Sequence, residues 1–194
     1  CLINSNSSFR DDYLTIKYDD KHSYKNRILS CLNEINDDEI VLFCHEDMFL
    51  YMKPDFVTIN QYINLIENNK CSLIKLIRAF EGLEKSNLHQ KLFKNPSNQL
   101  FSIQPTLLKI KTLKYIYKTV PGNNIWEFEA NTSKEYLKDL ISLCSFDINT
   151  DKRRGKFHYD SSVYPYICTA VIKGKWNLKE YKKELFEIFY NKKF

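Results

Sequence analysis

The sequence has few of the residues that interrupt regular structure and lacks several short motifs of well-known enzymes. Its 194 residues include 4 glycines and 5 prolines, which excludes a loop-dominated or low-complexity chain. No apolar run is long enough to span a membrane, and no signal peptide is visible. A Gly-rich phosphate loop, a serine elbow and a cysteine nucleophile with an evident partner are all missing. Any chemistry must therefore come from other side chains.

The cysteines form no CxxC pair, and no histidine stands at zinc-finger spacing from them. Most of them lie in apolar segments, where a reduced cysteine packs as a small hydrophobe. The six positions are Cys1, Cys31, Cys44, Cys71, Cys144 and Cys168. This usage favours a reducing, cytoplasmic compartment. Because the chain begins at Cys1 rather than at a methionine, we expect residues upstream of it to be missing.

What the chain does contain is typical of a globular protein with a substantial core. Hydrophobic residues make up 43%, charged residues 27% and aromatic residues 14% of the sequence. The length predicts one domain over residues 1–194. The net charge of +5 has two interpretations. It reflects either an ordinary solvated surface or a weak preference for an anionic partner, such as a phosphate-bearing ligand or a membrane surface. Because basic and acidic residues are interleaved, we expect no nucleic-acid partner.

The first part of the chain alternates strand and helix patterns. The predicted elements are a strand at 13–18, a helix from 24 to about 34 capped by Ser23, a strand at 40–44, a helix opening at Pro54 and Asp55, and a strand at 71–77. The unbroken apolar run at 40–44 is typical of a strand buried on both faces. This β-α-β-α-β order predicts a mostly parallel central sheet with helices on both faces.

The second part of the chain follows a different order. The pattern predicts a loop at 81–97, a short strand at 101–104, a helix starting at Pro105, and a helix led by the capping-box pair Thr132 and Glu135 and running through Leu143. A β-rich stretch at 164–172 and a final helix beginning near Leu178 complete the prediction. Residues 12–80 and 98–194 are the expected halves of the domain.

The triplet His45-Glu46-Asp47 directly follows the apolar run at 40–44. In an open parallel sheet, ligands bind beyond the carboxyl ends of the strands. Residues 45 and 47 can face the same site, because side chains alternate along an extended chain. Carboxylates at such a position suit Mg²⁺ or Mn²⁺. A charged turn that merely ends a strand is an equally good interpretation.

Two further groups of polar residues are candidates for binding or catalysis. In Trp126-Glu127-Phe128-Glu129, the indole can bind a sugar ring and either carboxylate can act as a general base. A helix start with Trp126 and Phe128 in the core is the alternative.

The turn at residues 19–23, together with Arg27, follows the first predicted strand, so we expect it at the same sheet edge as His45. Asp19, Asp20 and Arg27 would then contact a base, ribose or phosphate. A solvated turn is the simpler interpretation. Arg153, Arg154 and His158 form a basic segment that either closes over a diphosphate or is a plain exposed loop.

The order of these segments, with Gln104-Pro105-Thr106-Leu107 followed by Trp126-Glu127-Phe128-Glu129, resembles the GT-A-type glycosyltransferases over roughly residues 12–145. The resemblance implies a Rossmann-related α/β fold whose first βα unit is missing. It implies that Asp47 and His45 hold a divalent metal on a nucleotide-sugar diphosphate, with Glu46 beside them. It also implies that Glu129, with Glu127 as second choice, is the catalytic base, and that Gln104 and Trp126 line the acceptor side.

The leading hypothesis is therefore metal-assisted transfer of a sugar from a nucleoside-diphosphate donor to a glycan, lipid or protein acceptor. His45 in place of an expected acid is a departure from the family pattern. A metal-dependent phosphoesterase or nuclease built from the same acids is one alternative, and a non-enzymatic interaction protein is another. The sequence leaves the donor sugar, the acceptor and the oligomeric state open.

Overall fold

The structure is a computed structural model that describes the chain except for residues 1, 5–14, 46–47, 155–157, 173 and 191–194. Its helices are α1 (Tyr24–Leu32), α2 (Phe56–Glu67), α3 (Ile110–Thr119), α4 (Ile125–Ala130) and α5 (Leu178–Tyr190). Side-chain caps begin three of them: Ser23 accepts from the backbone of α1, Asp55 from that of α2 and Asn124 from that of α4. The predicted starts of α1 and α2 are confirmed.

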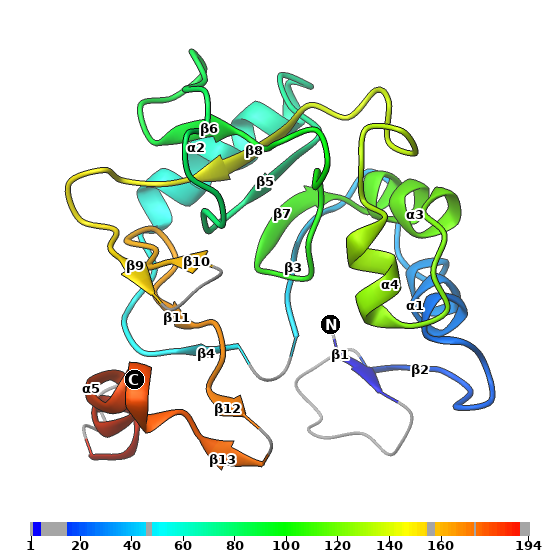
Figure 1. The fold of residues 1–194 in the computed structure, drawn as a ribbon. Helices are drawn as coiled ribbons and strands as arrows, with labels where there is room; N and C mark the ends of the chain where they lie inside the picture. The colour runs from blue at the N-terminus through cyan, green and yellow to red at the C-terminus, as the bar shows by residue number, and fades with distance from the viewer. Residues whose placement is uncertain (1, 5–14, 46–47, 155–157, 173, 191–194) are drawn as a thin grey trace.

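The strands are short. They are β1 (Leu2–Asn4), β2 (Thr15–Lys17), β3 (Ile40–Phe43), β4 (Phe49–Leu50), β5 (Leu73–Lys75), β6 (Leu92–Lys94), β7 (Thr106–Lys109), β8 (Ser142–Ser145), β9 (Arg153–Arg154), β10 (His158–Tyr159), β11 (Tyr166–Ile167), β12 (Val171–Ile172) and β13 (Lys175–Trp176). Five of them form the central sheet in the order β3-β7-β5-β8-β6, and the others pair in twos (Figure 1).

The central sheet is mixed and mostly antiparallel, so the predicted mostly parallel, Rossmann-related sheet is wrong. In the sheet as described, β5 and β8 are the one parallel pair, and the other three neighbouring pairs are antiparallel. The strand β7 lies between β3 and β5 and runs opposite to both. The first strand that the sequence predicted, β2, pairs with β1 outside this sheet.

Four predicted segments differ from the structure, and together they account for this error. The predicted loop at 81–97 contains β6, the segment 101–104 is not a strand, and the helix predicted to start at Pro105 begins only at Ile110, after β7. The helix predicted from Thr132 through Leu143 is also wrong, since β8 occupies its end. The strand β3 is half-buried rather than buried on both faces, because it lies at the edge of the described sheet and pairs with β7 alone.

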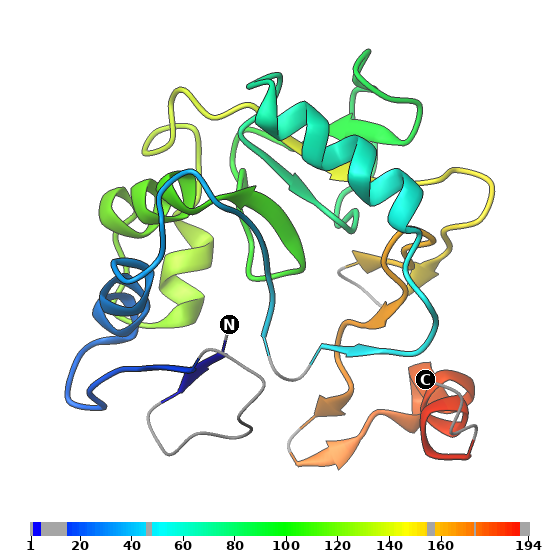
Figure 2. The same cartoon turned by 180° about the vertical axis from the view of Figure 1, so that it is seen from behind.

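Two separate cores cover the two faces of the central sheet. Helices α1, α3 and α4 pack on one face, where Phe101, Tyr117 and Phe128 form an aromatic centre with Tyr117 stacked on Phe128 at 4.5 Å. Helix α2 packs on the other face through residues such as Tyr62 and Ile66 (Figure 2). The sheet takes β3 and β5 from the first half of the chain and β6, β7 and β8 from beyond residue 80.

The last part of the chain forms a smaller unit beside the sheet. Strand β11 pairs with β4, the β12–β13 hairpin follows, and α5 packs on Ile167 and Ala170 through Tyr181 and Leu185. Across the residues that can be described, no helix combines the length and the apolar character needed to cross a membrane.

Candidate functional site

One edge of the central sheet brings together the ends of three strands. Because β3, β5 and β8 run in the same direction, their carboxyl ends lie at this edge, which we call the carboxyl edge (Figure 1). A single row of paired residues crosses all five strands just before it: Phe43, Thr106, Lys75, Cys144 and Phe93. Residues paired in register share a face, so this row faces the side of α3 and α4. Lys75 is the one charged residue in the row.

Lys75 is a buried cation without a hydrogen-bond partner among the described residues. The residue is 1% exposed, and the ring of Phe80 lies 6.0 Å from the ammonium nitrogen. Burial lowers the pKa of Lys75 to about 8, and the neighbouring Cys144 and Glu129 act in the opposite direction. A buried charge without a partner is unfavourable for folding, so such residues are candidates for binding a ligand.

Glu129, the predicted base, lies at this edge. It projects half-buried from α4, and its Oε1 accepts a hydrogen bond from the backbone nitrogen of Ile103. Its negative charge acts to raise the pKa of Lys75, against the larger effect of burial. Helix α4 therefore presents a carboxylate to the segment that precedes β7, near the buried ammonium.

The other predicted residues of α4 are placed differently. Glu127 is exposed, and its Oε2 accepts from the backbone nitrogen of Asn123 at 2.9 Å, which is a helix-capping role. Trp126 is 78% exposed, so it is not part of the core. A large aromatic side chain open to solvent is available as a binding surface, but Glu127 has a structural role that accounts for its presence.

Gln104 is held at the carboxyl edge by hydrogen bonds from Tyr166 and Cys168. Its Oε1 accepts hydrogen bonds from the Tyr166 hydroxyl and, at 3.0 Å, from the Cys168 thiol. Burial, with Cys168 beside it, raises the pKa of Tyr166 well above its ordinary value, so the hydroxyl stays protonated and can donate. The predicted acceptor residue therefore has a fixed amide, although it stands in a loop and not in a strand.

The predicted metal triplet is described only in part. His45 lies two residues beyond β3, is half-buried, and packs edge-on against Phe43 with ring centroids 5.9 Å apart. Glu46 and Asp47 lie outside the described residues. In the remainder of the chain, no three His, Cys, Asp or Glu side chains come together as a set of metal ligands. A metal at this edge would therefore depend on Glu46 and Asp47 as well as His45.

The predicted donor-binding turn at residues 19–23 bonds mainly to itself. Arg27 donates to the backbone oxygens of Asp20 and His22 and forms an ion pair with the Asp20 carboxylate at 3.6 Å. Asp19 accepts from the backbone nitrogen of Lys21 at 2.9 Å. Because β2 pairs with β1 and not with the central sheet, the strand-order argument that put this turn beside His45 does not apply.

The basic segment near residue 154 forms ion pairs with acids. Arg153 binds Glu81 at 2.8 Å, and Arg154 binds both Asp160, at 2.7 Å, and the buried Glu184. Arg154 thereby ties β9 to helix α5. These contacts assign the two arginines to structure rather than to a diphosphate.

Sequence reasoning missed two cations near the carboxyl edge. Lys75 lies within the strand predicted at 71–77, and a single lysine among the apolar residues of such a strand is itself a signal of a special site. The guanidinium of Arg78 lies 4.3 Å from the ring of Phe146 and 4.8 Å from that of Tyr159. Both cations belong to the short segment 71–78: Lys75 is the last residue of β5, and Arg78 lies three residues beyond it.

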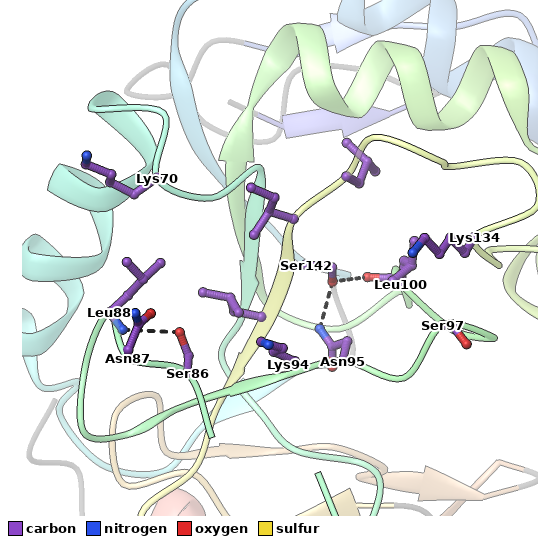
Figure 3. A pocket seen from close by; sticks show the side chains of 13 residues that line it. Lys70, Ser86, Asn87, Leu88, Lys94, Asn95, Ser97, Leu100, Lys134 and Ser142 are labelled. Carbon is purple, nitrogen blue, oxygen red and sulfur yellow. Dashed lines mark hydrogen bonds between the residues drawn. The ribbon is translucent and has the colours of Figure 1, made fainter. Parts of the chain in front are cut away.

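A cavity of about 380 Å³ lies elsewhere, beside the start of β8 and the end of β6 (Figure 3). Lys70, Lys94 and Lys134 surround it, and Asn95 donates to Ser142 at 2.8 Å in its wall. The three lysines are exposed, and Lys94 is already paired with Glu84. We assign the site to the carboxyl edge, because the buried unpartnered cation and its nearby carboxylate are there.

Comparison of the chain with protein-family models, with curated proteins and with solved structures gave no match. The functional assignment therefore depends on the chemistry of the carboxyl edge.

Proposed function

We propose that the protein transfers a sugar from a nucleoside-diphosphate donor to a hydroxyl acceptor at the carboxyl edge of the central sheet. The observation that carries this proposal is that the buried Lys75 and the half-buried Glu129 both lie at the edge where the chain leaves β3 towards His45. A fixed positive charge suits a departing diphosphate, and a half-buried carboxylate suits the acceptor hydroxyl. Together they would serve an inverting glycosyl transfer.

Glu129 takes the acceptor proton in this proposal. One of its oxygens, Oε1, is held by the backbone nitrogen of Ile103, which fixes the carboxylate in orientation. The amide of Gln104 is fixed by Tyr166 and Cys168 through its oxygen, so we assign its nitrogen to an acceptor hydroxyl. Trp126 offers an exposed aromatic surface to the acceptor.

Lys75 acts on the donor through its charge. Because it lies behind the edge in a poorly hydrated environment, its field is screened less than that of an exposed lysine. Asp47, with His45 or Glu46, would hold Mn²⁺ or Mg²⁺, and a divalent ion there would offset the charge of the diphosphate. The described cysteines are all free thiols, which supports the cytoplasmic assignment as part of the same proposal: Cys31, Cys44, Cys71, Cys144 and Cys168.

Thermal unfolding in the presence of Mn²⁺ and, in turn, ADP, GDP, UDP or CDP tests donor binding. A nucleotide at a hundred times its dissociation constant stabilises the fold by about 2.7 kcal/mol, which raises the melting temperature by roughly 5–10 °C for a chain of this size. We expect one nucleotide to give this shift, and Asp47→Ala to lose the part that depends on Mn²⁺. Equal melting temperatures with every nucleotide would contradict the proposal.

Glu129→Gln separates binding from chemistry. The amide oxygen still accepts from Ile103, so this variant should fold and bind nucleotide while losing transfer. Glu127→Gln is the matched control, because Glu127 caps α4 from an exposed position and should retain transfer. Hydrolysis of a generic phosphodiester by the wild-type protein, without sugar transfer, would favour the phosphoesterase alternative instead.

A further inference from the structure

An exposed aromatic face covers the β12–β13 hairpin and the outer side of α5. We call it the aromatic face and define it by Val171, Trp176, Phe186, Phe189 and Tyr190, which are 42–71% exposed. The side chains are continuous, since Trp176 meets Phe189 at 5.1 Å and Phe186 stacks on Tyr190 at 4.4 Å. Contiguous exposed apolar surface of this kind marks an interaction site.

The aromatic face lies on the side of α5 that the core does not use. The buried side of the helix carries Tyr181 and Leu185, which pack on Ile167 and Ala170. Strand pairing of Val171 with Trp176 places both on one side of the hairpin. The hairpin and α5 lie together at one end of the molecule, away from the central sheet (Figures 1 and 2).

Exposed lysines accompany the aromatic side chains, whereas the acids of α5 are buried or half-buried. Exposed lysines in this region are Lys175, Lys179, Lys182 and Lys183. The acids of α5 are Glu180 and Glu187, which are half-buried, and Glu184, which is buried and paired with Arg154. Helical spacing puts Lys182 and Lys183 beside Phe186 and puts Glu184 on the other side of the helix, while the half-buried Glu187 borders the face between Lys183 and Tyr190.

We infer that the aromatic face docks the protein on the surface of an anionic lipid bilayer. Charge complementarity favours an anionic bilayer, since exposed lysines flank the aromatic side chains and the protein carries a net charge of +5. Tryptophan, tyrosine and lysine are the residues that settle at a membrane–water boundary, with rings at the headgroup level and ammonium groups in water. The core of a protein–protein interface, in contrast, is depleted of lysine. The inference is independent of the proposed function.

Sedimentation with phosphatidylcholine vesicles, prepared with and without phosphatidylserine, tests the inference on the whole chain. We expect more binding to the vesicles that contain phosphatidylserine, and weaker binding as salt is raised. Each lysine near such a surface contributes about fivefold, so Lys182→Gln/Lys183→Gln should weaken binding roughly 25-fold. The matched control is Lys118→Gln/Lys138→Gln, which changes two exposed lysines elsewhere and should weaken binding by much less.

The apolar contribution is tested with Phe186→Ser/Phe189→Ser. Because both side chains are about half exposed, the fold should survive, and unchanged thermal unfolding would confirm it. This variant should lose binding to both kinds of vesicle, whereas Val57→Ser, at an exposed apolar position on α2, should keep it.

Three results would overturn the inference. They are the absence of vesicle sedimentation by the wild-type chain, equal binding by the face variants and their controls, and concentration-dependent self-association that Phe186→Ser/Phe189→Ser abolishes. The last result, measured by size-exclusion chromatography, would assign the aromatic face to contact between two copies of the chain.

Discussion

Lys75→Met should make the protein more stable at neutral pH, although it removes a charged group from the centre of the fold. Burial lowers the pKa of Lys75 from its ordinary value of 10.5 to about 8. That difference corresponds to roughly 3 kcal/mol of unfavourable free energy when the amine is charged. Methionine has a similar volume and no charge, so it should recover up to that amount.

The gain should depend on pH in a defined direction. Between pH 8 and 10.5 the unfolded chain keeps the Lys75 proton while the folded chain releases it. The wild-type protein therefore becomes more stable relative to Lys75→Met as the pH rises through this window. Urea unfolding at pH 7 and at pH 9.5 measures the difference between the two proteins, and other titrating groups largely cancel in that difference.

Lys138→Met is the control, because Lys138 is exposed and its substitution should change stability by less than about 0.5 kcal/mol at either pH. Equal stability of Lys75→Met and the wild-type protein at pH 7 would refute the reasoning. So would a difference that stays constant between the two pH values. If Lys75 serves the donor diphosphate, the stabilised variant should also show a smaller nucleotide-induced rise in melting temperature.

Three further substitutions have expected outcomes. Gly122→Ala should lower the free energy of unfolding by roughly 2 kcal/mol in urea titration, because an added Cβ would lie 2.6 Å from the backbone nitrogen of Phe128 and φ is +154°. Asp55→Ala should lower it by about 1 kcal/mol, since Asp55 accepts from the nitrogen and hydroxyl of Thr58 at 3.1 and 2.6 Å. Those bonds lower the pKa of Asp55, so this difference should be full at neutral pH and fade as acid protonates the carboxylate. Trp126→Ser should leave stability within about 0.5 kcal/mol, because the indole is 78% exposed, and should weaken acceptor binding in a titration.

Controls separate these mechanisms from general disruption. Gly82→Ala also has a positive φ, +64°, but its added Cβ meets no atom within 4 Å, so it should be milder than Gly122→Ala. Equal losses at the two glycines would contradict the steric argument. A loss for Asp55→Ala that persists unchanged in acid would contradict the capping argument.

The sequence predicted those elements whose signals are local. Ser23 and Asp55 are side-chain caps that bond within three residues, and the apolar spacing behind them repeats within each helix. Both the start and the type of α1 and α2 could therefore be read without knowing what they pack against. The final helix α5 was predicted for the same reason, with Tyr181 and Leu185 on its buried side.

The sheet could not be predicted in this way, because its strand order is set by distant pairing. The run Thr106–Lys109 is short and follows a proline, so a helix start was a reasonable prediction. Backbone bonds to β3 on one side and β5 on the other make it a strand. Likewise Ser142–Ser145 becomes β8 by pairing with β5 and β6, which overrides the apparent capping box at Thr132.

The candidate site was likewise predicted only in part from the sequence. Gln104 and Glu129 were chosen from sequence, and both lie at the carboxyl edge. Lys75 was missed, because its isolation from partners is a property of packing that depends on β7, β8 and α4. Asp19, Asp20 and Arg27 were expected at this edge only through the wrong sheet order.

The release of nucleoside diphosphate from a panel of nucleotide-sugars, with Mn²⁺ and a mixture of glycan acceptors present to take the sugar, tests the central claim most directly. We expect one donor to release its diphosphate in the wild-type protein and in Glu127→Gln, and release to fall by about two to four orders of magnitude in Glu129→Gln. We also expect Asp47→Ala to lose release as it loses the Mn²⁺-dependent stabilisation. No release from any donor, or equal release by Glu129→Gln and the wild-type protein, would contradict glycosyl transfer at the carboxyl edge.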